Sequence, residues 1–493
     1  MSRTKRAPLQ RNSKNALYYG DNLYVLRKYL NDSSVDLIYL DPPFKSDKNY
    51  NVLFKKKSDD EAASDDAQIV AFTDTWTWGP DDKSQLDELI SVAEPQIATT
   101  VKSLYQILGT SDMMSYVVMM AARLIELYRV LRPGGSIFLH CDPSASHYLK
   151  IVMDSIFGPS QFINEIVWHH GLGAFSAKDR FPSKHDILLF YRKRGGEVTW
   201  TKLRGDVTEA MRKKYSHKDE QGHYMLSYGK KYYLKGGKPF DDVWAIPAIS
   251  PTSSERLGYP TQKPLALLER VIKAASNEGD VVLDPFCGCG TAIIAAQSHG
   301  RKWIGIDVSF LAVELIRERI DESFHGQVTY QVNGIPTDAA SAIALHEGDP
   351  FEFERWAVSS LDGFPNDRQR GDKGIDGRIR FWHDKSELKE MIVSVKGGKS
   401  LNPSMIRDLR GTIERLEKEL GLLITNYEPT SGMIDEANSA GSYENPVSGR
   451  RYPRIQIITS EEILKGQRPN MPMVESPYRR AVALDSQTVL DVD

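Results

Sequence analysis

Cysteine is scarce in this sequence, and its scarcity excludes whole classes of protein. Three cysteines, Cys141, Cys287 and Cys289, occur among 493 residues, too few for a disulfide scaffold. No group of cysteines and histidines stands beside Cys287 and Cys289 at the spacing of a zinc site, so we expect no metal there. The lack of a disulfide scaffold is typical of a reducing compartment, and we expect a cytoplasmic protein.

Long apolar runs are missing as well. No stretch reaches the roughly 18 apolar residues of a membrane span, so we predict no transmembrane helix and no membrane partner. Residues 1–14 are basic but lack the apolar segment of a secretory signal, which predicts a flexible leader; a phosphate-contacting arm is the alternative. The chain is too long for one hydrophobic core, which predicts two or three domains.

A large excess of one charge sign is also absent, because the formal net charge is only −3. The local balance differs: residues 161–250 contain 16 Lys and Arg against 10 Asp and Glu, and they lack regular periodicity. Local positive charge is what contact with nucleic-acid phosphates requires, although a solvated charged face has the same composition. We predict that this segment is a separate region that recognises the substrate.

Strand and helix patterns alternate on both sides of that segment, in residues 15–160 and 251–325. Apolar runs predict strands over residues 36–40, 136–140, 281–284 and 303–307. Helical spacing predicts helices over residues 117–131, 264–275 and up to about 297. Such alternation predicts an α/β fold with a parallel sheet. The polar, acidic residues 56–112 predict an insertion or a mobile loop.

A further unit follows a predicted linker at residues 326–348. Within residues 349–475 we predict a helix over 351–361, strands over 377–382 and 391–396, a helix over 403–420 and a strand over 422–425. Residues 476–493 predict a flexible tail.

A glycine-containing turn joins a predicted strand to a predicted helix within residues 283–291. Gly288 and Gly290 let the backbone turn tightly and approach a ligand, and the carboxylate of Asp307, at the end of the next strand, can accept hydrogen bonds from ribose hydroxyls. A dinucleotide site would need a third glycine where Ile293 stands. S-adenosylmethionine (SAM) carries a sulfonium and an ammonium group, which suit the carboxylate of Asp284. The turn therefore favours SAM over NAD; a turn without a ligand is the alternative.

The tetrapeptide Asp41-Pro42-Pro43-Phe44 follows the strand predicted over residues 36–40, at the kind of sheet edge where ligands bind. The exocyclic amine of a nucleobase is a poor nucleophile, because its lone pair is delocalised into the ring. The Asp41 carboxylate can accept one N–H, and the Pro42 carbonyl, held extended by Pro43, can accept the other. Two such acceptors would turn the nitrogen toward sp³ geometry and aim its lone pair at the SAM methyl group.

A base inside a duplex has to be extruded before such chemistry. Phe44 offers a ring for the extruded base to stack on, worth about 1–3 kcal/mol. The alternative for this segment is a strand that simply ends at an Asp-Pro turn.

Together these motifs resemble the DNA amino-methyltransferases of the β arrangement, in which the catalytic motif precedes the SAM loop. The resemblance covers residues 15–325 and implies a Rossmann-like SAM-dependent sheet, with residues 161–250 as the inserted target-recognition region. It implies catalytic roles for residues 41–44, and His140 to Asp142 resemble the strand end that flanks the base pocket. It implies a cofactor-binding set of Asp21, Thr261, Lys263, Asp284, Pro285, Phe286, Gly288, Gly290, Thr291 and Asp307.

The C-terminal unit resembles a PD-(D/E)xK nuclease of the Mrr-like kind, on the segments 374–377 and 393–396. The resemblance implies a restriction-endonuclease-like α/β domain in which Asp376 holds Mg²⁺, Lys396 orients the attacking water and Glu354 adds an outer carboxylate. Ser394 stands where this family carries Glu or Gln, and serine is a weak Mg²⁺ ligand. Active nuclease, inactive DNA-binding domain and unrelated α/β domain therefore stay open.

The resemblance implies a site-specific methyltransferase of double-stranded DNA, in restriction–modification or phage defence. An Asp at position 41 suggests adenine N6, whereas Ser there more often accompanies cytosine N4. Cytosine N4 methylation with an inactive, DNA-binding C-terminal domain is the alternative, and a DNA-binding protein that uses SAM only as an effector is a third. The sequence leaves a homodimer open.

Overall fold

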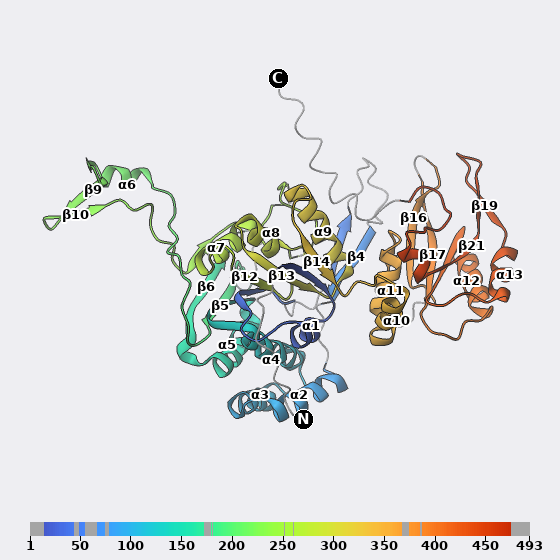
Figure 1. Ribbon diagram of the computed structural model, residues 1–493, viewed down its shortest axis with the longest axis horizontal. Coiled ribbons are helices and arrows are strands. Elements are labelled where there is room, and N and C mark those ends of the chain that lie inside the picture. Colours follow the sequence, from blue (N-terminus) through green and yellow to red (C-terminus); the bar gives the residue numbers. More distant parts are fainter. Residues whose placement is uncertain are drawn as a thin grey trace, which may run out of the picture.

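Two α/β units lie beside each other, and an arm projects from the first unit on the side away from the second (Figure 1). The computed structural model describes residues 14–43, 49–54, 67–73, 78–171, 179, 181–250, 252–259, 261–366, 374–384 and 387–474. In this part of the chain, no helix is both long enough and apolar enough to cross a lipid bilayer.

The first unit is built on a nine-stranded sheet that is parallel except for β7, which runs antiparallel to both of its neighbours. Its strands, in spatial order, are β11 (Val243–Ala245), β6 (Phe162–His169), β7 (His185–Arg192), β5 (Leu131–Cys141), β2 (Val35–Leu40), β12 (Val281–Asp284), β13 (Lys302–Asp307), β1 (Asn15–Tyr19) and β14 (Tyr330–Asn333). All residues of β2 and β12 are buried, as expected for central strands covered on both faces. The predicted parallel α/β sheet is confirmed.

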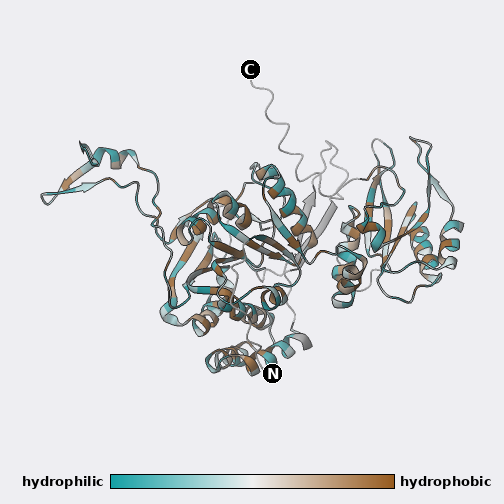
Figure 2. Ribbon diagram, in the orientation of Figure 1, coloured by the Kyte–Doolittle hydropathy of each residue, from teal (hydrophilic) through white to brown (hydrophobic). Residues whose placement is uncertain are grey.

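Helices cover both faces of this sheet. One face packs against α1 (Asn22–Tyr29), α4 (Asp112–Val130) and α5 (Pro143–Phe157), with α2 (Pro80–Val92) and α3 (Pro95–Leu108) outside them. The other packs against α7 (Leu265–Ala275), α8 (Thr291–Ser298) and α9 (Phe310–Phe324). Figure 2 shows the apolar residues concentrated in the strands and on the helix sides that face them.

The order of the central strands places two predicted motifs at one sheet edge. Strands β2 and β12 are parallel neighbours, with Leu283 opposite Ile38. Their carboxyl ends therefore meet at the same edge. Pro42 and Pro43 follow β2 there, and because proline cannot donate a ladder hydrogen bond, the strand ends before them.

Three boundaries differ from the prediction. Residues 56–112, expected to form an insertion or mobile loop, include the helices α2 and α3, whose apolar residues pack against α4 and α5. The segment 161–250 is not wholly separate, because β6, β7 and β11 extend the main sheet. The expected linker 326–348 contains β14, an edge strand of the main sheet, and the helix α10 (Ala339–Gly348). The sequence patterns did not predict these elements, because the strands are short and the helices are mixed in polarity.

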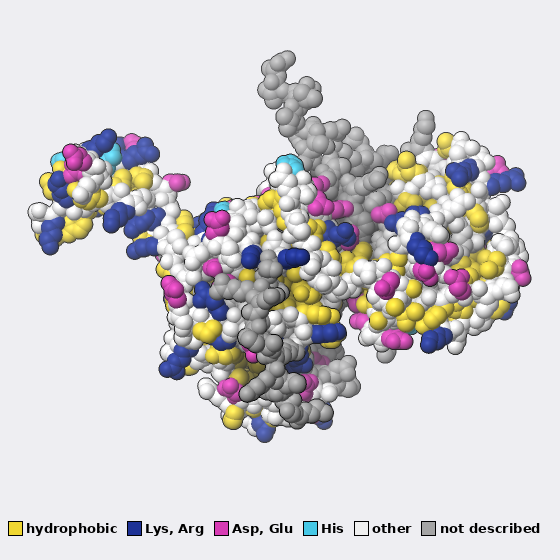
Figure 3. Space-filling model, viewed as in Figure 1, with side chains coloured by type: hydrophobic (Ala, Val, Ile, Leu, Met, Phe, Trp, Pro, Cys, Tyr) yellow, Lys and Arg dark blue, Asp and Glu magenta, His cyan; other side chains and the backbone are white. Residues whose placement is uncertain are grey.

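The arm is the part of segment 161–250 that leaves the sheet. It contains α6 (Glu209–Lys214), β8 (His217–Asp219), β9 (Gly222–Ser227) and β10 (Lys230–Tyr233), the three strands forming a small antiparallel sheet. Residues 201–240 contain ten Lys and Arg against four Asp and Glu, so the arm carries the positive excess of the segment. Figure 3 shows these cations spread over the arm.

The second unit is a five-stranded mixed sheet with helices around it. Its strands, in spatial order, are β15 (Phe364–Pro365), β16 (Gly377–Trp382), β17 (Leu388–Lys396), β18 (Leu420–Thr425) and β21 (Ile455–Thr459). Its helices are α10, α11 (Pro350–Ser359), α12 (Ser404–Arg415), α13 (Ser431–Ser439) and α14 (Ser460–Leu464). A hairpin of β19 (Ser442–Glu444) and β20 (Arg451–Pro453) is attached to it. The strand and helix types predicted here are confirmed, with shifted ends.

Candidate active site

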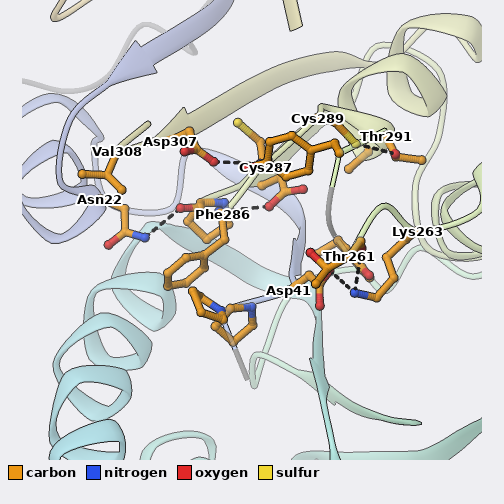
Figure 4. A pocket seen from close by; sticks show the side chains of 18 of the residues that line it. Asn22, Asp41, Thr261, Lys263, Phe286, Cys287, Cys289, Thr291, Asp307 and Val308 are labelled. Atoms are coloured by element: carbon orange, nitrogen blue, oxygen red, sulfur yellow. Dashed lines mark hydrogen bonds and ion pairs between the residues drawn. The ribbon is translucent and has the colours of Figure 1, made fainter. Parts of the chain in front are cut away.

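A cavity of about 360 Å³ opens at the carboxyl edge of the first sheet, between the ends of β2, β12 and β13. Figure 4 shows side chains from all three strand ends pointing toward it. The predicted residues that line it are Asp21, Asp41, Pro42, Pro43, Thr261, Lys263, Asp284, Pro285, Phe286, Gly288, Thr291 and Asp307. Phe44 lies outside the described residues. Residues 41–43 of the tetrapeptide and the glycine turn within residues 283–291 therefore line the same cavity.

Asp41 lies at the end of β2 and is held by a cation. The ammonium of Lys263, whose side chain is 8% exposed, forms an ion pair with Asp41 Oδ2 (Figure 4). Lys263 also donates a hydrogen bond to the carbonyl of Thr261, at 3.2 Å. Thr261 has a positive φ of 60°, which marks a tight turn before α7. Lys263 therefore contacts the carboxylate expected to be catalytic.

His140 is a buried neighbour of Asp41. Its Nδ1 lies 2.9 Å from the Tyr39 hydroxyl and 3.8 Å from Asp41 Oδ1, and its Nε2 lies 3.3 Å from Asp186 Oδ2. Burial opposes ionisation of Asp186, but the bond to His140 and the nearby Lys263 charge outweigh it and lower the pKa of Asp186. Asp142, from the same motif, is the N-cap of α5 and accepts a hydrogen bond from the Ala145 amide.

Asp284 ends β12 in the floor of the cavity. Its Oδ1 accepts a hydrogen bond from the Phe286 amide at 3.0 Å. Burial raises the pKa of Asp284 well above its usual value, and the negative charges of Asp41 and Asp307 raise it further, against the opposing effect of Lys263. A cation that entered the cavity would favour the ionised form of this carboxylate.

Asp307 ends β13, and its carboxylate fixes the glycine turn. Oδ2 accepts the Gly288 amide and Oδ1 accepts the Ser309 amide, each at 2.8 Å. Burial raises the pKa of Asp307 to about 6; the charge of Glu352 adds to the rise, while the amides of Ser309, Gly288 and Val308 oppose it. A ligand hydroxyl that donates to this carboxylate would favour its ionised form.

The two glycines of the turn have different surroundings. Gly288 has φ 49° and faces the cavity, where a Cβ would stand 3.3 Å from the Tyr259 ring. Gly290 has φ 77° and begins α8 as its N-cap, and a Cβ there would stand 2.8 Å from Ile316 Cγ1. Gly290 was predicted to bind the cofactor, but it is not among the lining residues. Its position instead needs glycine for the turn itself.

The other end of the cavity is formed by α1 and α4. Asp21 is the N-cap of α1 and pairs with Arg123 of α4 at 2.6 Å, while the Asn22 amide donates to the Pro285 carbonyl at 2.7 Å. Lining residues outside the predicted site set are Asn22, Tyr39, Met119, Arg123, Tyr259, Gln262, Leu268, Cys287, Cys289, Ala292, Val308 and Arg355. Most of them lie within or next to a recognised motif, and this position could have predicted them as lining residues. Nothing in the sequence around Met119, Arg123 and Arg355 indicates a role in the cavity.

The C-terminal motif residues also meet at one strand end. Asp376 Oδ2 accepts the Val395 amide at 2.6 Å and the Ser394 hydroxyl at 3.2 Å, and Lys396 Nζ lies 3.8 Å from it. Glu354 lies on α11, which packs against β16 and β17. Within the described residues, the His, Asp and Glu side chains close enough together to hold a metal ion are His383, Asp384 and Glu387, a group that does not include Asp376.

A Rossmann-like sheet with an acidic cavity at its carboxyl edge defines a cofactor-dependent α/β enzyme. Comparison with known proteins narrows the class. The profile of the DNA methylases of the N6/N4 type matches residues 35–318, and the chain belongs to that family. The profile of an Mrr-type restriction endonuclease family matches residues 345–464. The protein is thus a SAM-dependent DNA methyltransferase joined to a restriction-endonuclease-like domain.

Two individual relatives agree with this family by sequence. Type II methyltransferase M.HpaI of Haemophilus parainfluenzae is 31% identical over 54% of this chain and 76% of its own length. DNA adenine methyltransferase YhdJ of Escherichia coli (strain K12) is 26% identical over 64% of this chain and 85% of its own. The solved M1.HpyAVI–SAM complex is similar over 62% of this chain and 98% of its own, at 17% identity and a TM-score of 0.33.

Proposed function

We propose that this protein methylates N6 of adenine in specific sites of double-stranded DNA, on a base extruded from the duplex. The observation that carries the proposal is that Asp41 lines the same cavity as Asp284, Asp307 and the glycine turn. A base amino group bound by Asp41 would then lie next to a cofactor bound at the glycine turn. Direct methyl transfer requires this geometry.

The proposed chemistry depends on two oxygen acceptors. Asp41 uses Oδ2 for its ion pair with Lys263, and its other carboxylate oxygen accepts one N–H of the base. The Pro42 carbonyl accepts the second N–H, so the nitrogen lone pair points into the cavity. Lys263 keeps the carboxylate oriented during the reaction, and the buried His140 with Tyr39 supports the same strand end.

The cavity residues fit SAM by their charge. Asp284 lies where a sulfonium and an ammonium group find an anionic partner, and Asp307 offers acceptors for ribose hydroxyls. Gly288 lines the cavity, and because it has no side chain its backbone can approach the ligand closely. When bound, SAM supplies the electrophilic methyl group.

Methyl transfer from isotope-labelled SAM to DNA tests the catalytic assignment. We expect Asp41→Ala to reduce incorporation at least a hundredfold while binding S-adenosylhomocysteine with nearly wild-type affinity. Asp142→Ala is the matched control, since it removes a nearby helix cap and no lining residue. Incorporation by Asp41→Ala equal to that of the wild type would remove the mechanism.

The identity of the base is a separate point. The Asp at position 41, together with the resemblance noted for the tetrapeptide, supports adenine over cytosine. Digestion of modified DNA to nucleosides and mass analysis would give N6-methyladenine under this proposal. N4-methylcytosine as the product would establish the cytosine alternative and leave the two-acceptor mechanism intact.

We further propose that the C-terminal domain cleaves DNA with Mg²⁺ held by Asp376, in a restriction–modification or defence role. The favouring observation is that Asp376, Ser394 and Lys396 meet at the end of β17, where Val395, Ser394 and Lys396 all contact Oδ2 of the Asp376 carboxylate. Mg²⁺ commonly takes one or two carboxylates plus phosphate and water ligands, so one protein carboxylate is compatible. The bound ion would polarise the scissile phosphate.

Plasmid cleavage tests this second proposal. Mg²⁺-dependent nicking or cutting by the wild type should vanish in Asp376→Ala and in Lys396→Ala, while Lys399→Ala, an exposed neighbour, should retain it. A wild type that leaves plasmids of every methylation state intact would reduce the domain to a DNA-binding role.

A further inference from the structure

The wall of the cofactor cavity includes a side chain from the endonuclease-like domain. Arg355 lies on α11, inside the region matched by the restriction endonuclease profile, whereas the other lining residues fall between Asp21 and Val308. Helix α11 packs against α9 of the methyltransferase sheet and also against β15, β16 and β17 of its own sheet. It therefore stands between the two sheets, as Figure 1 also shows.

A buried hydrogen-bond chain fixes α11 beside Asp307. Tyr19 is the last residue of β1 and lies directly opposite Asp307 of β13 in the parallel register. The Tyr19 hydroxyl donates to Glu352 Oε2 at 2.5 Å, and Glu352 Oε1 accepts from Arg355 Nη1 at 2.7 Å. Tyr19 is 4% exposed and Glu352 is 8% exposed, so their hydrogen bond joins the two units out of water, whereas the Arg355 side chain is 32% exposed.

The charges in this contact act on the cavity. Glu352 is one of the groups that raise the pKa of Asp307, and Arg355 offsets part of the cost of burying the Glu352 carboxylate. The packing of Phe364 of β15 against the cluster of Tyr259, Cys289 and Leu311 adds an apolar contact behind the glycine turn. The second unit therefore touches the cavity wall at two places.

We propose that Arg355 contacts the bound cofactor, donating a hydrogen bond to its adenosyl part beside Asp307, so that cofactor binding fastens α11 to the methyltransferase sheet. The inference rests on the proposed cofactor site. A guanidinium has five N–H donors, and the pair with Glu352 engages Nη1; ribose oxygens and adenine ring nitrogens are acceptors. A ligand that prefers the docked position of α11 stabilises that position by the same free energy, because linkage is reciprocal.

The competing explanation is that Arg355 only forms an i,i+3 ion pair with Glu352 on its own helix. Such a pair would be worth little and would not depend on a ligand. The two explanations differ in what happens when an adenosyl ligand binds, which makes binding and hydrogen exchange the informative measurements.

Titration calorimetry of the full chain with S-adenosylhomocysteine is the first test. We expect Arg355→Ala to weaken binding about tenfold, as for a lost hydrogen bond to a charged group, and Arg355→Lys to lose less. The control is Arg378→Ala, an arginine of the same domain that also pairs with a carboxylate but does not line the cavity. It should bind like the wild type.

Hydrogen exchange of the wild type, with and without S-adenosylhomocysteine, is the second test and needs no variant. We expect the ligand to slow exchange in α11 as well as in α8, and to leave α13, on the far side of the second sheet, unchanged. Tyr19→Phe should reduce the protection of α11 and keep that of α8. Protection confined to α8, with unchanged affinity in Arg355→Ala, would overturn the inference.

The two levels of failure are distinguishable. A wild type that does not bind S-adenosylhomocysteine overturns the cofactor assignment and this inference with it. A wild type that binds, with Arg355→Ala binding equally and α11 unprotected, leaves the proposed methyltransferase site standing and overturns only the role of Arg355.

Discussion

Three carboxylates, Asp41, Asp284 and Asp307, converge on one cavity, and their mutual repulsion is a cost that folding alone does not explain. Lys263 neutralises part of it, yet burial and like charges still raise the pKa values of Asp284 and Asp307. Such perturbed groups cluster at functional sites, because the ligand provides what the free protein lacks. Here a cationic ligand with hydroxyl donors is the natural complement.

Cofactor affinity should depend on the titration of Asp307. Burial raises the pKa of Asp307 to about 6, above the usual aspartate value of about 4, so its contribution to stability is present below about pH 4 and is lost as pH rises through 6. A ribose that donates to the carboxylate prefers the ionised form. We therefore expect S-adenosylhomocysteine affinity to rise up to tenfold per pH unit below 6 and to level off above it, measured by calorimetry.

Asp307→Asn is the control for this pH profile. An amide does not titrate in this range, so its binding should be weaker and should lack the rise near pH 6. Any dependence that comes from Asp284, whose pKa burial also raises, should remain. A wild-type profile without a rise near pH 6 would contradict the assignment of Asp307 to ribose.

The ion pair of Lys263 and Asp41 should stabilise the fold as well as orient the carboxylate. Lys263→Met leaves Asp41, whose side chain is 16% exposed, without its cation, and we expect a loss of about 1–3 kcal/mol in unfolding free energy. Thermal and denaturant unfolding would measure it. The double variant Lys263→Met with Asp41→Asn should recover part of the loss; additive effects would show that the pair is not coupled.

At the scale of elements, the glycine turn joins β12 to α8 through two residues with positive φ. Gly290→Ala places a methyl group against Ile316 in addition to the backbone strain, and we expect a loss of about 2–4 kcal/mol, measured by unfolding.

Gly279 provides a matched comparison for that variant. Its φ of 82° is close to the 77° of Gly290, but a Cβ there would meet open space. Gly279→Ala should therefore cost only the backbone strain, about 1–2 kcal/mol. Equal losses of unfolding free energy in the two variants would mean that the contact with Ile316 does not contribute to the destabilisation by Gly290→Ala.

The sequence predicted the elements whose pattern is strong. The central strands β2, β12 and β13 are mostly apolar and end at recognisable motifs, so both their position and the meeting of Asp41 with Asp284 followed from the rule for parallel sheets. Helices α2 and α3 were missed because their residues are mixed in polarity and continue an acidic stretch. Strand β14 was missed because four edge residues, three of them half-buried and one exposed, give little pattern.

At the scale of the whole molecule, the sequence could not reveal Arg355 as a cavity residue. Arg355 belongs to the other unit and is part of no recognisable motif. It enters the cavity that Asp307 lines only because α11 packs against α9. The segment 161–250 was predicted to form a separate region, but its strands β6, β7 and β11 belong to the main sheet. Only residues 201–240 form the arm.

The basic arm should act as a phosphate-contacting element. Replacing the exposed residues Arg212, Lys214 and Lys230 together by alanine should weaken DNA binding at all sequences. It should lower the slope of log affinity against log salt by about 0.9 for each phosphate contact removed. Filter binding or anisotropy at several salt concentrations measures this, and S-adenosylhomocysteine affinity should not change. A variant with an unchanged salt slope would show that the arm does not touch DNA.

A structure of the protein with S-adenosylhomocysteine and a duplex containing its target site tests the central claim most directly. We predict an extruded base whose amino nitrogen lies about 3 Å from both the Asp41 carboxylate and the Pro42 carbonyl, with the cofactor sulfur on the open side of that nitrogen. A target base still stacked in the duplex, or an amino group turned away from these two oxygens, would contradict the account.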